Sequence, residues 1–313
     1  MNTRTPQVIT TAGLTKSYGR HSALSGVDLA VRQGEVFGFL GPNGAGKTTT
    51  IRILLDLIRR DSGELDVLGH DPRTNGVRIR RDIGYLPGEL AIASRRPARE
   101  LLTYLGNLRG GVRRSRIEEL AERLNLDVSR PIRGLSKGNK QKVGLVQAFM
   151  HEPRLLVLDE PTSGLDPLLQ QEFLAMVREV RDDGRTVFMS SHVLSEVQDV
   201  ADRAAVIRDG QIVATEDMDA LRGRSSRRIT LRFADPVSAE EFTAAERVRD
   251  VVVDGDTLHC RVDGSPDSLI KLAAKHTVLA LTSEELDLEE LFFTHYNGGD
   301  AGTDGKAGRD AAA

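Results

Sequence analysis

The segment Gly41-Pro-Asn-Gly-Ala-Gly-Lys-Thr-Thr49 constrains the fold of this chain more than any other feature. It matches the P-loop pattern G-x-x-x-x-G-K-[ST] and lies between an apolar run and a helical pattern. Glycines let backbone N–H groups close around phosphate oxygens, and the following helix N-terminus adds partial positive charge. We expect Lys47 to reach the β- and γ-phosphates and the Thr48 hydroxyl to suit Mg²⁺. The alternative is a glycine-rich turn that matches by chance.

Composition excludes several classes of protein. The 313 residues suffice for two domains, and 43 basic against 46 acidic residues give a formal net charge of −3. This balance, with no tryptophan and few aromatic residues, argues against a nucleic-acid-binding protein. The single cysteine, Cys260, forms no internal disulfide, which fits a reducing compartment. Apolar runs fall short of the ~20 residues of a membrane span, and no signal peptide is recognised. We expect a cytosolic chain that meets a membrane only through a partner.

The larger part of the chain, about 1–222, alternates short apolar runs with amphipathic stretches. Strands are predicted at 36–40, 83–86, 155–158 and 186–189, and helices at about 47–58, 137–150, 167–182 and 194–201. This alternation predicts an α/β fold with a mainly parallel sheet and helices on its faces. The segment 7–36 alternates differently and indicates an antiparallel patch.

A second, smaller domain is predicted at 229–297. The polar residues 223–228 are typical of a linker, and 298–313 are typical of a disordered tail. The predicted order is strand 229–233, helix 238–245, strand 248–253, strand 257–262, helix 267–274, strand 278–282 and helix 287–296. This order is close to the split βαβ, ferredoxin-like pattern of an α+β domain.

Two carboxylates follow the apolar run Leu155 to Leu158. Charges at the end of a buried strand are costly unless they have a function. Asp159 suits a water-mediated contact with Mg²⁺, and Glu160 suits polarising an attacking water, which contributes about 10²–10⁴ in rate. The alternative is a strand end capped by solvated acids. The P-loop earlier in the chain favours the catalytic interpretation.

At Leu135-Ser-Lys-Gly-Asn139 the chain resembles a known family, the ATP-binding subunits of ABC transporters. LSKGN is similar to the LSGGQ signature, Ser163-Gly-Leu-Asp166 resembles the D-loop, and Ser190-Ser-His192 resembles the switch-histidine segment. Tyr18 matches the aromatic residue that stacks on adenine. The motifs occur in the order of the family over about 3–296.

The resemblance implies a P-loop ATPase with a helical subdomain at about 88–150. It implies a head-to-tail homodimer, in which the signature of one copy covers ATP on the P-loop of the other. It also implies a separate integral membrane permease as partner, at the cytoplasmic side of the membrane, and no nucleic acid. The implied site residues are Lys47, Glu160 and His192 for catalysis, Tyr18, Gly41, Pro42, Asn43, Gly44, Ala45, Gly46, Lys47, Thr48, Thr49, Ser136, Gly138 and Asp166 for ATP, and Thr48 and Asp159 for Mg²⁺.

Several of these residues also have a structural interpretation. Tyr18 is alternatively a half-buried strand tyrosine, and His192 a structural histidine. Ser136 and Gly138 are alternatively a plain helix N-cap, and Asp166 is alternatively the N-cap of the helix that starts at Pro167. For Ser136 both interpretations can hold, because an N-cap loop is also an anion site.

The chain departs from the family pattern in two places. Gly88-Glu89 stands where the family usually has a glutamine that binds Mg²⁺ and senses the membrane partner. We hypothesise that Glu89 takes over part of that role, the alternative being a solvated loop acid. In the signature, Lys137 and Asn139 replace glycine and glutamine, and the favoured interpretation is that Lys137 points to solvent.

The signature, the small second domain and the ending Leu288-Glu-Glu-Leu-Phe-Phe-Thr-His-Tyr296 resemble the ABC-2, or daunorubicin-resistance, branch of drug and antibiotic exporters. The ending is also interpreted as an amphipathic helix that packs on the sheet of the small domain. Between Arg73 and Arg116, eleven arginines accompany only three acids. We hypothesise that they hold acidic groups of the membrane partner or the anionic inner leaflet, the alternative being a solvated basic face.

Two other classes of function compete with a transport ATPase. A soluble ABC-type ATPase with a regulatory role is the main alternative. However, the chain lacks the long coiled coil of DNA-repair relatives and the doubled motif set of ribosome-acting relatives. A module that binds ATP without hydrolysing it is disfavoured by the intact Lys47, Asp159, Glu160 and His192.

Overall fold

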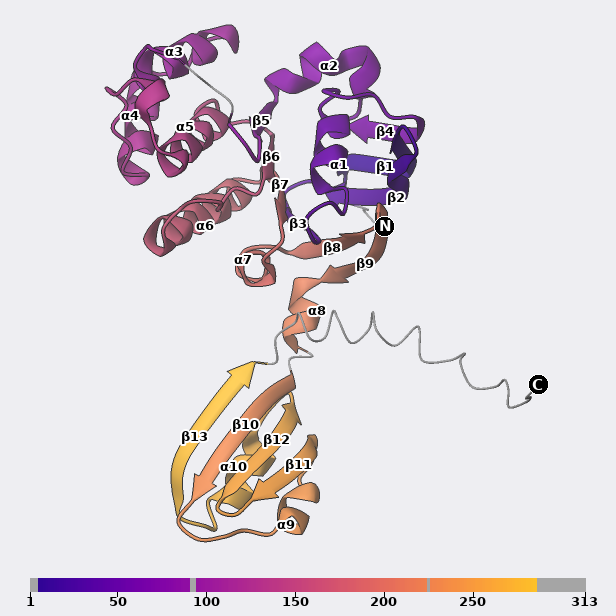
Figure 1. The fold of residues 1–313 in the computed structure, drawn as a ribbon, viewed down its shortest axis with the longest axis vertical. Coiled ribbons are helices and arrows are strands. Elements are labelled where there is room, and N and C mark those ends of the chain that lie inside the picture. The colour runs from indigo at the N-terminus through magenta and orange to yellow at the C-terminus, as the bar shows by residue number, and fades with distance from the viewer. Residues whose placement is uncertain (1–4, 91–93, 224–225, 286–313) are drawn as a thin grey trace, which may run out of the picture. The chain divides into compact units, whose positions relative to one another are not determined.

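The computed structural model describes residues 5–90, 94–223 and 226–285 (Figure 1). The chain divides into two compact units, Met1–Met218 and Asp219–Ala313, each with its own core. Within the described ranges, no helix combines the length and the apolar character needed to cross a bilayer.

A six-stranded sheet forms the centre of the first unit, with the strand order β5-β6-β7-β3-β8-β9. The first four strands and β8 are parallel, and β9 pairs antiparallel with β8. The central strands are fully buried, as expected for parallel strands covered on both faces. The strands are β3 (Val36–Leu40), β5 (Ile83–Leu86), β6 (Leu155–Asp159), β7 (Thr186–Ser191), β8 (Arg203–Arg208) and β9 (Gln211–Asp217).

A three-stranded antiparallel sheet, with the order β2-β1-β4, packs near helix α1 (Lys47–Leu54) (Figure 1). One apolar cluster joins side chains from this sheet, from α1 and from the large sheet, including Val27, Ile51 and Phe39. The strands are β1 (Gln7–Tyr18), β2 (His21–Arg32) and β4 (Ser62–Val67). The antiparallel patch predicted at 7–36 is therefore confirmed, and β4 is an addition to it.

A group of helices lies between β5 and β6 in sequence and forms a separate lobe of the unit (Figure 1). It contains α3 (Ala98–Leu108), α4 (Arg114–Arg123), the short 3-10 helix η1 (Ile132–Gly134) and α5 (Lys137–Phe149). Arg123 of α4 bonds both Glu172 and Glu179 of α6 (Pro167–Asp182), at 2.6 and 2.7 Å. These ion pairs join the lobe to a helix that covers the sheet. Helix α2 (Pro72–Arg81) precedes β5, and α7 (Leu194–Gln198) follows β7.

The second unit contains a four-stranded antiparallel sheet with the order β11-β12-β10-β13. Its core includes Phe233, Phe242 and Leu269, which come from one strand and two helices. The elements are α8 (Met218–Gly223) at the boundary, then β10 (Ser226–Phe233), α9 (Ala239–Thr243), β11 (Val248–Asp254), β12 (Thr257–Asp263), α10 (Asp267–Ala273) and β13 (Val278–Glu285).

Several predicted boundaries need correction. Helix α1 ends at Leu54 rather than near 58, because Asp56 adopts a left-handed φ of 53° and its N–H bonds Ile53 O at 3.0 Å, which closes the helix. Helix α7 ends at Gln198 rather than at 201. The predicted linker 223–228 is shorter, because α8 reaches Gly223 and β10 begins at Ser226. The helix predicted at 287–296 and the tail at 298–313 lie outside the described residues.

Candidate functional site

The loop after β3 forms the first part of the site. It leads from the C-terminal end of β3 directly into the N-terminus of α1. Gly46, at the N-cap, has a φ of 112°, and a Cβ there would lie 2.7 Å from Leu24 Cδ2, so the position requires glycine. Helix α1 has neither a side-chain cap nor an acidic residue in its first turn. Its first N–H groups are therefore available to an anionic ligand.

Lys47 places a buried ammonium group inside this loop. The residue is 5 % exposed, and Nζ donates hydrogen bonds to Gly41 O at 2.6 Å and Pro42 O at 3.3 Å. Nζ also lies 3.2 Å from Oε1 of Glu160. A buried charge needs such partners. Phosphate oxygens are chemically equivalent partners, so the ammonium suits binding of a phosphate chain.

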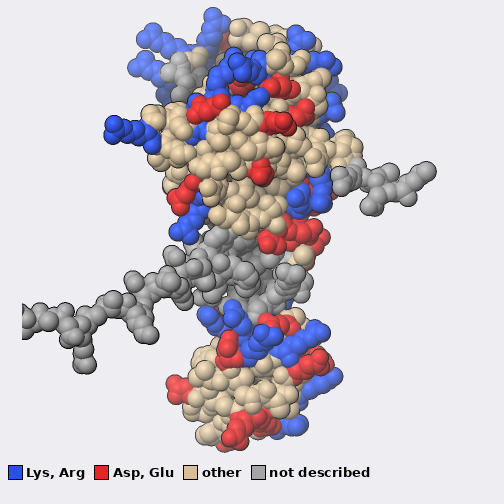
Figure 2. Space-filling model, turned by 90° about the vertical axis from the view of Figure 1, so that its right-hand side faces the viewer, with Lys and Arg blue, Asp and Glu red and all other residues tan. Residues whose placement is uncertain are grey.

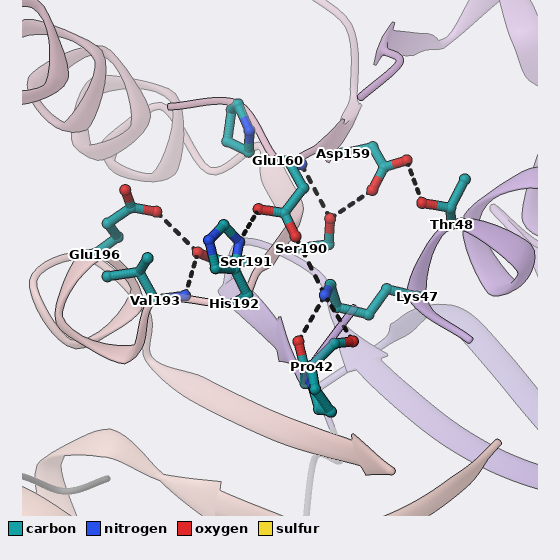
Figure 3. Close-up of polar contacts among 12 residues, drawn as sticks. Pro42, Lys47, Thr48, Asp159, Glu160, Ser190, Ser191, His192, Val193 and Glu196 are labelled. Atoms are coloured by element: carbon teal, nitrogen blue, oxygen red, sulfur yellow. Dashed lines mark hydrogen bonds and ion pairs between the residues drawn. The ribbon is translucent and has the colours of Figure 1, made fainter. Parts of the chain in front are cut away.

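A hydroxyl and a carboxylate meet beside the first turn of α1. Thr48 Oγ1 donates to Oδ2 of Asp159 at 2.8 Å, and Ser190 Oγ donates to Oδ1 of the same carboxylate at 2.7 Å (Figure 3). Such hard oxygen ligands fit Mg²⁺, which keeps most of its waters and takes one or two protein ligands beside phosphates. No group of three or more His, Cys, Asp or Glu residues suited to a metal occurs in the described part of the chain. A shared metal–phosphate site therefore fits better than an all-protein metal cage.

Glu160 lies directly between a lysine and a histidine. Its Oε2 is 2.7 Å from His192 Nδ1, and its Oε1 faces Lys47 (Figure 3). Oε1 is buried, and no described group donates a hydrogen bond to it. The Lys47 ammonium, 3.2 Å away, is the charged partner of this oxygen. The sequence predicted both Glu160 and His192 as catalytic residues, and the structure brings their side chains together.

A pocket of about 260 Å³ opens above the loop. It includes the predicted residue Tyr18, which is 49 % exposed and which has the Lys16 ammonium 5.6 Å from the centroid of its ring. It also includes His21 and Ala23, which the sequence analysis missed. His21 reaches the pocket through the β1–β2 hairpin, in which it pairs with Tyr18 across the turn. The lining residues are Tyr18, His21, Ala23, Pro42, Asn43, Gly44, Gly46, Lys47, Thr48, Thr49 and Glu160.

Ser136, Gly138 and Asp166 are not among the residues that line this pocket. Ser136 is the N-cap of α5 and accepts from Asn139 N at 3.3 Å. Asp166 is the N-cap of α6 and accepts from Leu169 N at 3.0 Å. Both are exposed. The structural role expected for each is present, and their surfaces are free for a second molecule.

One departure from the family pattern, Gly88, lies beside the Asp159 carboxylate. A Cβ on Gly88 would lie 3.3 Å from Asp159 Oδ2, so the glycine touches the site directly. Glu89 and Lys137 are both exposed. Nearby, Tyr85 of β5 is partly buried, and burial together with the negative charge of Asp159 raises its pKa. The phenol therefore stays neutral beside the site.

Comparison with known proteins shows the relatives of this chain. The family model described as "ABC transporter" matches residues 24–163. The bacitracin transport ATP-binding protein BcrA of Bacillus licheniformis is 33 % identical over 304 residues, which cover 94 % of this chain and 99 % of that protein. The daunorubicin/doxorubicin resistance ATP-binding protein DrrA of Streptomyces peucetius is 34 % identical over 307 residues, which cover 93 % of this chain and 93 % of that protein.

Solved structures show the same fold for the first unit. An ATP-binding subunit of an ABC transporter superimposes with a TM-score of 0.63 at 28 % identity, covering 69 % of this chain and 92 % of that one. A dimeric ATP-binding cassette bound to ADP and Pi superimposes with a TM-score of 0.60 at 24 % identity, covering 67 % of this chain and 98 % of that one. The coverage in both corresponds to about two thirds of the chain.

Proposed function

This chain belongs to the ATP-binding proteins of ABC transporters and hydrolyses ATP, and from that premise we propose that it drives export of an antibiotic, a drug or another amphipathic compound. It is the ATP-binding subunit of an exporter. The proposed cargo is supported by the share of this chain over which the relatives align. The bacitracin and daunorubicin/doxorubicin proteins match over 93 % or more of this chain, so the likeness includes the second unit.

The position of Glu160 between Lys47 and His192 is the observation that carries the catalytic assignment. In this assignment Lys47 binds the phosphate chain, Glu160 accepts a proton from the attacking water through Oε1, and His192 orients the carboxylate through Oε2. When bound, Mg²⁺ neutralises phosphate charge, and Thr48 and Asp159 would hold it.

The functional assembly is a head-to-tail homodimer. Ser136, Gly138 and Asp166 lie outside the pocket of their own chain, and we assign them to the nucleotide of the partner copy. A twofold axis then makes two equivalent composite sites. The dimeric relative of known structure supports this assembly. The alternative, a closed site within one chain, leaves the exposed surfaces of Ser136 and Asp166 without a ligand.

A separate integral membrane permease completes the exporter and holds this chain at the cytoplasmic face of the membrane. Basic side chains gather at the end of the first unit where Figure 1 places α2 and α3 (Figure 2). Four of the eleven arginines there already pair with glutamates: Arg96, Arg99, Arg114 and Arg116. Five other arginines are exposed and form no ion pair with the described residues: Arg73, Arg78, Arg81, Arg95 and Arg113. We assign these five to acidic groups of the permease.

We assign Glu89 to part of the role of the missing glutamine, through water, and Lys137 to solvent. The order β10-α9-β11-β12-α10-β13 and the sheet order β11-β12-β10-β13 support a ferredoxin-like fold for the second unit.

A resistance assay tests the proposed function. Bacteria would express this chain together with a candidate permease, and growth would be measured with bacitracin, daunorubicin and doxorubicin. The matched control carries Glu160→Gln. We expect resistance to at least one compound, lost in the control. An ATP hydrolysis rate that is the same with and without the membrane protein, together with no resistance to any compound, would support the soluble regulatory alternative instead.

A further inference from the structure

Helix α5 contributes a buried glutamine to which the site described above assigns no role. Gln141 is 4 % exposed. Its Nε2 donates hydrogen bonds to the backbone carbonyls of Glu160, at 3.3 Å, and Pro161, at 3.1 Å. A buried amide must find such partners, since an unmade hydrogen bond there is costly. Here both partners lie on the segment that carries the catalytic carboxylate.

The backbone of Glu160 is held in an uncommon conformation. Its φ is 49°, in the left-handed region that a residue with a Cβ seldom adopts. Its N–H donates to Ser190 Oγ at 3.0 Å, and its carbonyl accepts from Gln141 and from Ser163 N, the latter at 3.2 Å. The direction of the Glu160 side chain depends on these bonds, because they keep the backbone in that conformation.

Helix α5 touches the same segment at a second point. A Cβ on Gly138 would lie only 2.6 Å from Gly164 O, so the two backbones are in direct contact. Gly138 and Gln141 are three residues apart and lie on one face of the helix. The first turn of α5, which begins after Ser136, is therefore attached to residues 160–164 at both ends.

We propose that Gln141 is a positioning residue, which makes the orientation of the Glu160 carboxylate depend on the position of helix α5. The inference rests on the proposed homodimer. In that dimer the helix that presents Ser136 to the nucleotide of the partner also orients the carboxylate of its own site. Occupation of one composite site is thereby linked, through one helix and two hydrogen bonds, to the readiness of the other.

The first test compares Gln141→Met with Gln147→Met, a matched control on the same helix. Methionine keeps the length of the side chain but has no donor. We expect the Gln141 variant to lose up to about a hundredfold in kcat, the loss that a misplacement of about 1 Å can cause. Its ATP concentration for half-maximal dimer formation stays within about twofold of wild type. Weakened dimer formation with unchanged kcat, or no change in either, overturns the proposal.

The second test is a double-mutant cycle with Glu160→Gln. If Gln141 acts through the carboxylate, then Gln141→Met has no further effect on the residual rate once the carboxylate is gone. Effects that multiply independently show a general loss of structure and overturn the inference. A wild-type chain that hydrolyses ATP without forming a dimer contradicts the proposed assembly instead. The cycle still reports on Gln141 and Glu160 in that case.

Discussion

Oε2 of Glu160 and Nδ1 of His192 lie 2.7 Å apart, although the two residues are 32 positions apart in the chain. They follow β6 and β7, which are parallel neighbours in the sheet, so the loops after the two strands meet at one edge. The contact leaves the second oxygen of Glu160 facing Lys47.

Replacing Glu160 by glutamine should abolish most hydrolysis and leave ATP binding intact. The amide keeps the shape of the side chain but accepts no proton, so kcat should fall by about 10²–10⁴. Phosphate release and equilibrium binding of ATP measure the two effects. Glu118→Gln, on the surface of α4, is the control. A Glu160→Gln variant that keeps more than half of the wild-type rate would show that another group is the base.

Removing the ring of Tyr18 should weaken ATP binding. Stacking of a base on an aromatic ring contributes roughly 1–3 kcal/mol, so Tyr18→Ala should raise the Kd for ATP about tenfold or more. Tyr18→Phe keeps the ring and should bind like wild type. Calorimetric titration distinguishes the two variants. Equal losses in both would assign the effect to the hydroxyl and contradict stacking.

Gly138→Ala should destabilise the first unit. The added Cβ would lie 2.6 Å from Gly164 O, and a backbone carbonyl cannot move aside cheaply. Overpacking of this kind costs about 1–3 kcal/mol. Gly134→Ala is the matched control, because no atom lies within 4 Å of its Cβ position. The urea concentrations at the unfolding midpoints of the two variants are compared. Equal midpoints would mean that α5 does not contact Gly164 closely.

His151 should make the protein less stable in mild acid. Burial and the nearby charge of Arg109, whose Nη1 is 2.7 Å from Nε2, lower the pKa of His151 to about 4. A histidine in the unfolded chain has a pKa near 6.5. The unfolded state therefore binds a proton first, and stability falls as the pH drops from about 6.5 towards 4, by up to roughly 3 kcal/mol.

Denaturant titrations at pH 7.5 and pH 5 measure that loss. His151→Gln keeps an acceptor for Arg109 but does not titrate, so this variant should lose less stability between the two pH values. An identical loss in both proteins would assign the pH dependence to other groups.

The sequence predicted the central strands that carry the candidate site residues. The P-loop, the carboxylates at the end of β6 and the histidine after β7 each follow a recognisable apolar run, and those runs form the central strands. The strand β4 and the helix α2 were missed. β4, Ser62–Val67, has its first three residues exposed, and α2 buries only Pro72 and Ile79, so neither shows a strong apolar pattern.

Gln141 and His21 were missed for a different reason. Both are single polar residues whose importance comes from contacts made across long stretches of sequence. Gln141 reaches carbonyl groups 19 and 20 residues away, and His21 reaches the pocket only because the β1–β2 hairpin folds back on itself. No local pattern contains such a contact.

The sequence alone determined which groups are available, because motif spacing and apolar periodicity are local properties of the chain. It determined a P-loop motif, two carboxylates after an apolar run, a histidine after the next run and the type of fold that carries them. The tertiary structure alone decided how these groups meet. The strand order β5-β6-β7-β3 brings the loop ends together, and the packing of α5 against residues 160–164 fixes where the Glu160 carboxylate points. Both depend on contacts between distant residues, which only the folded chain makes.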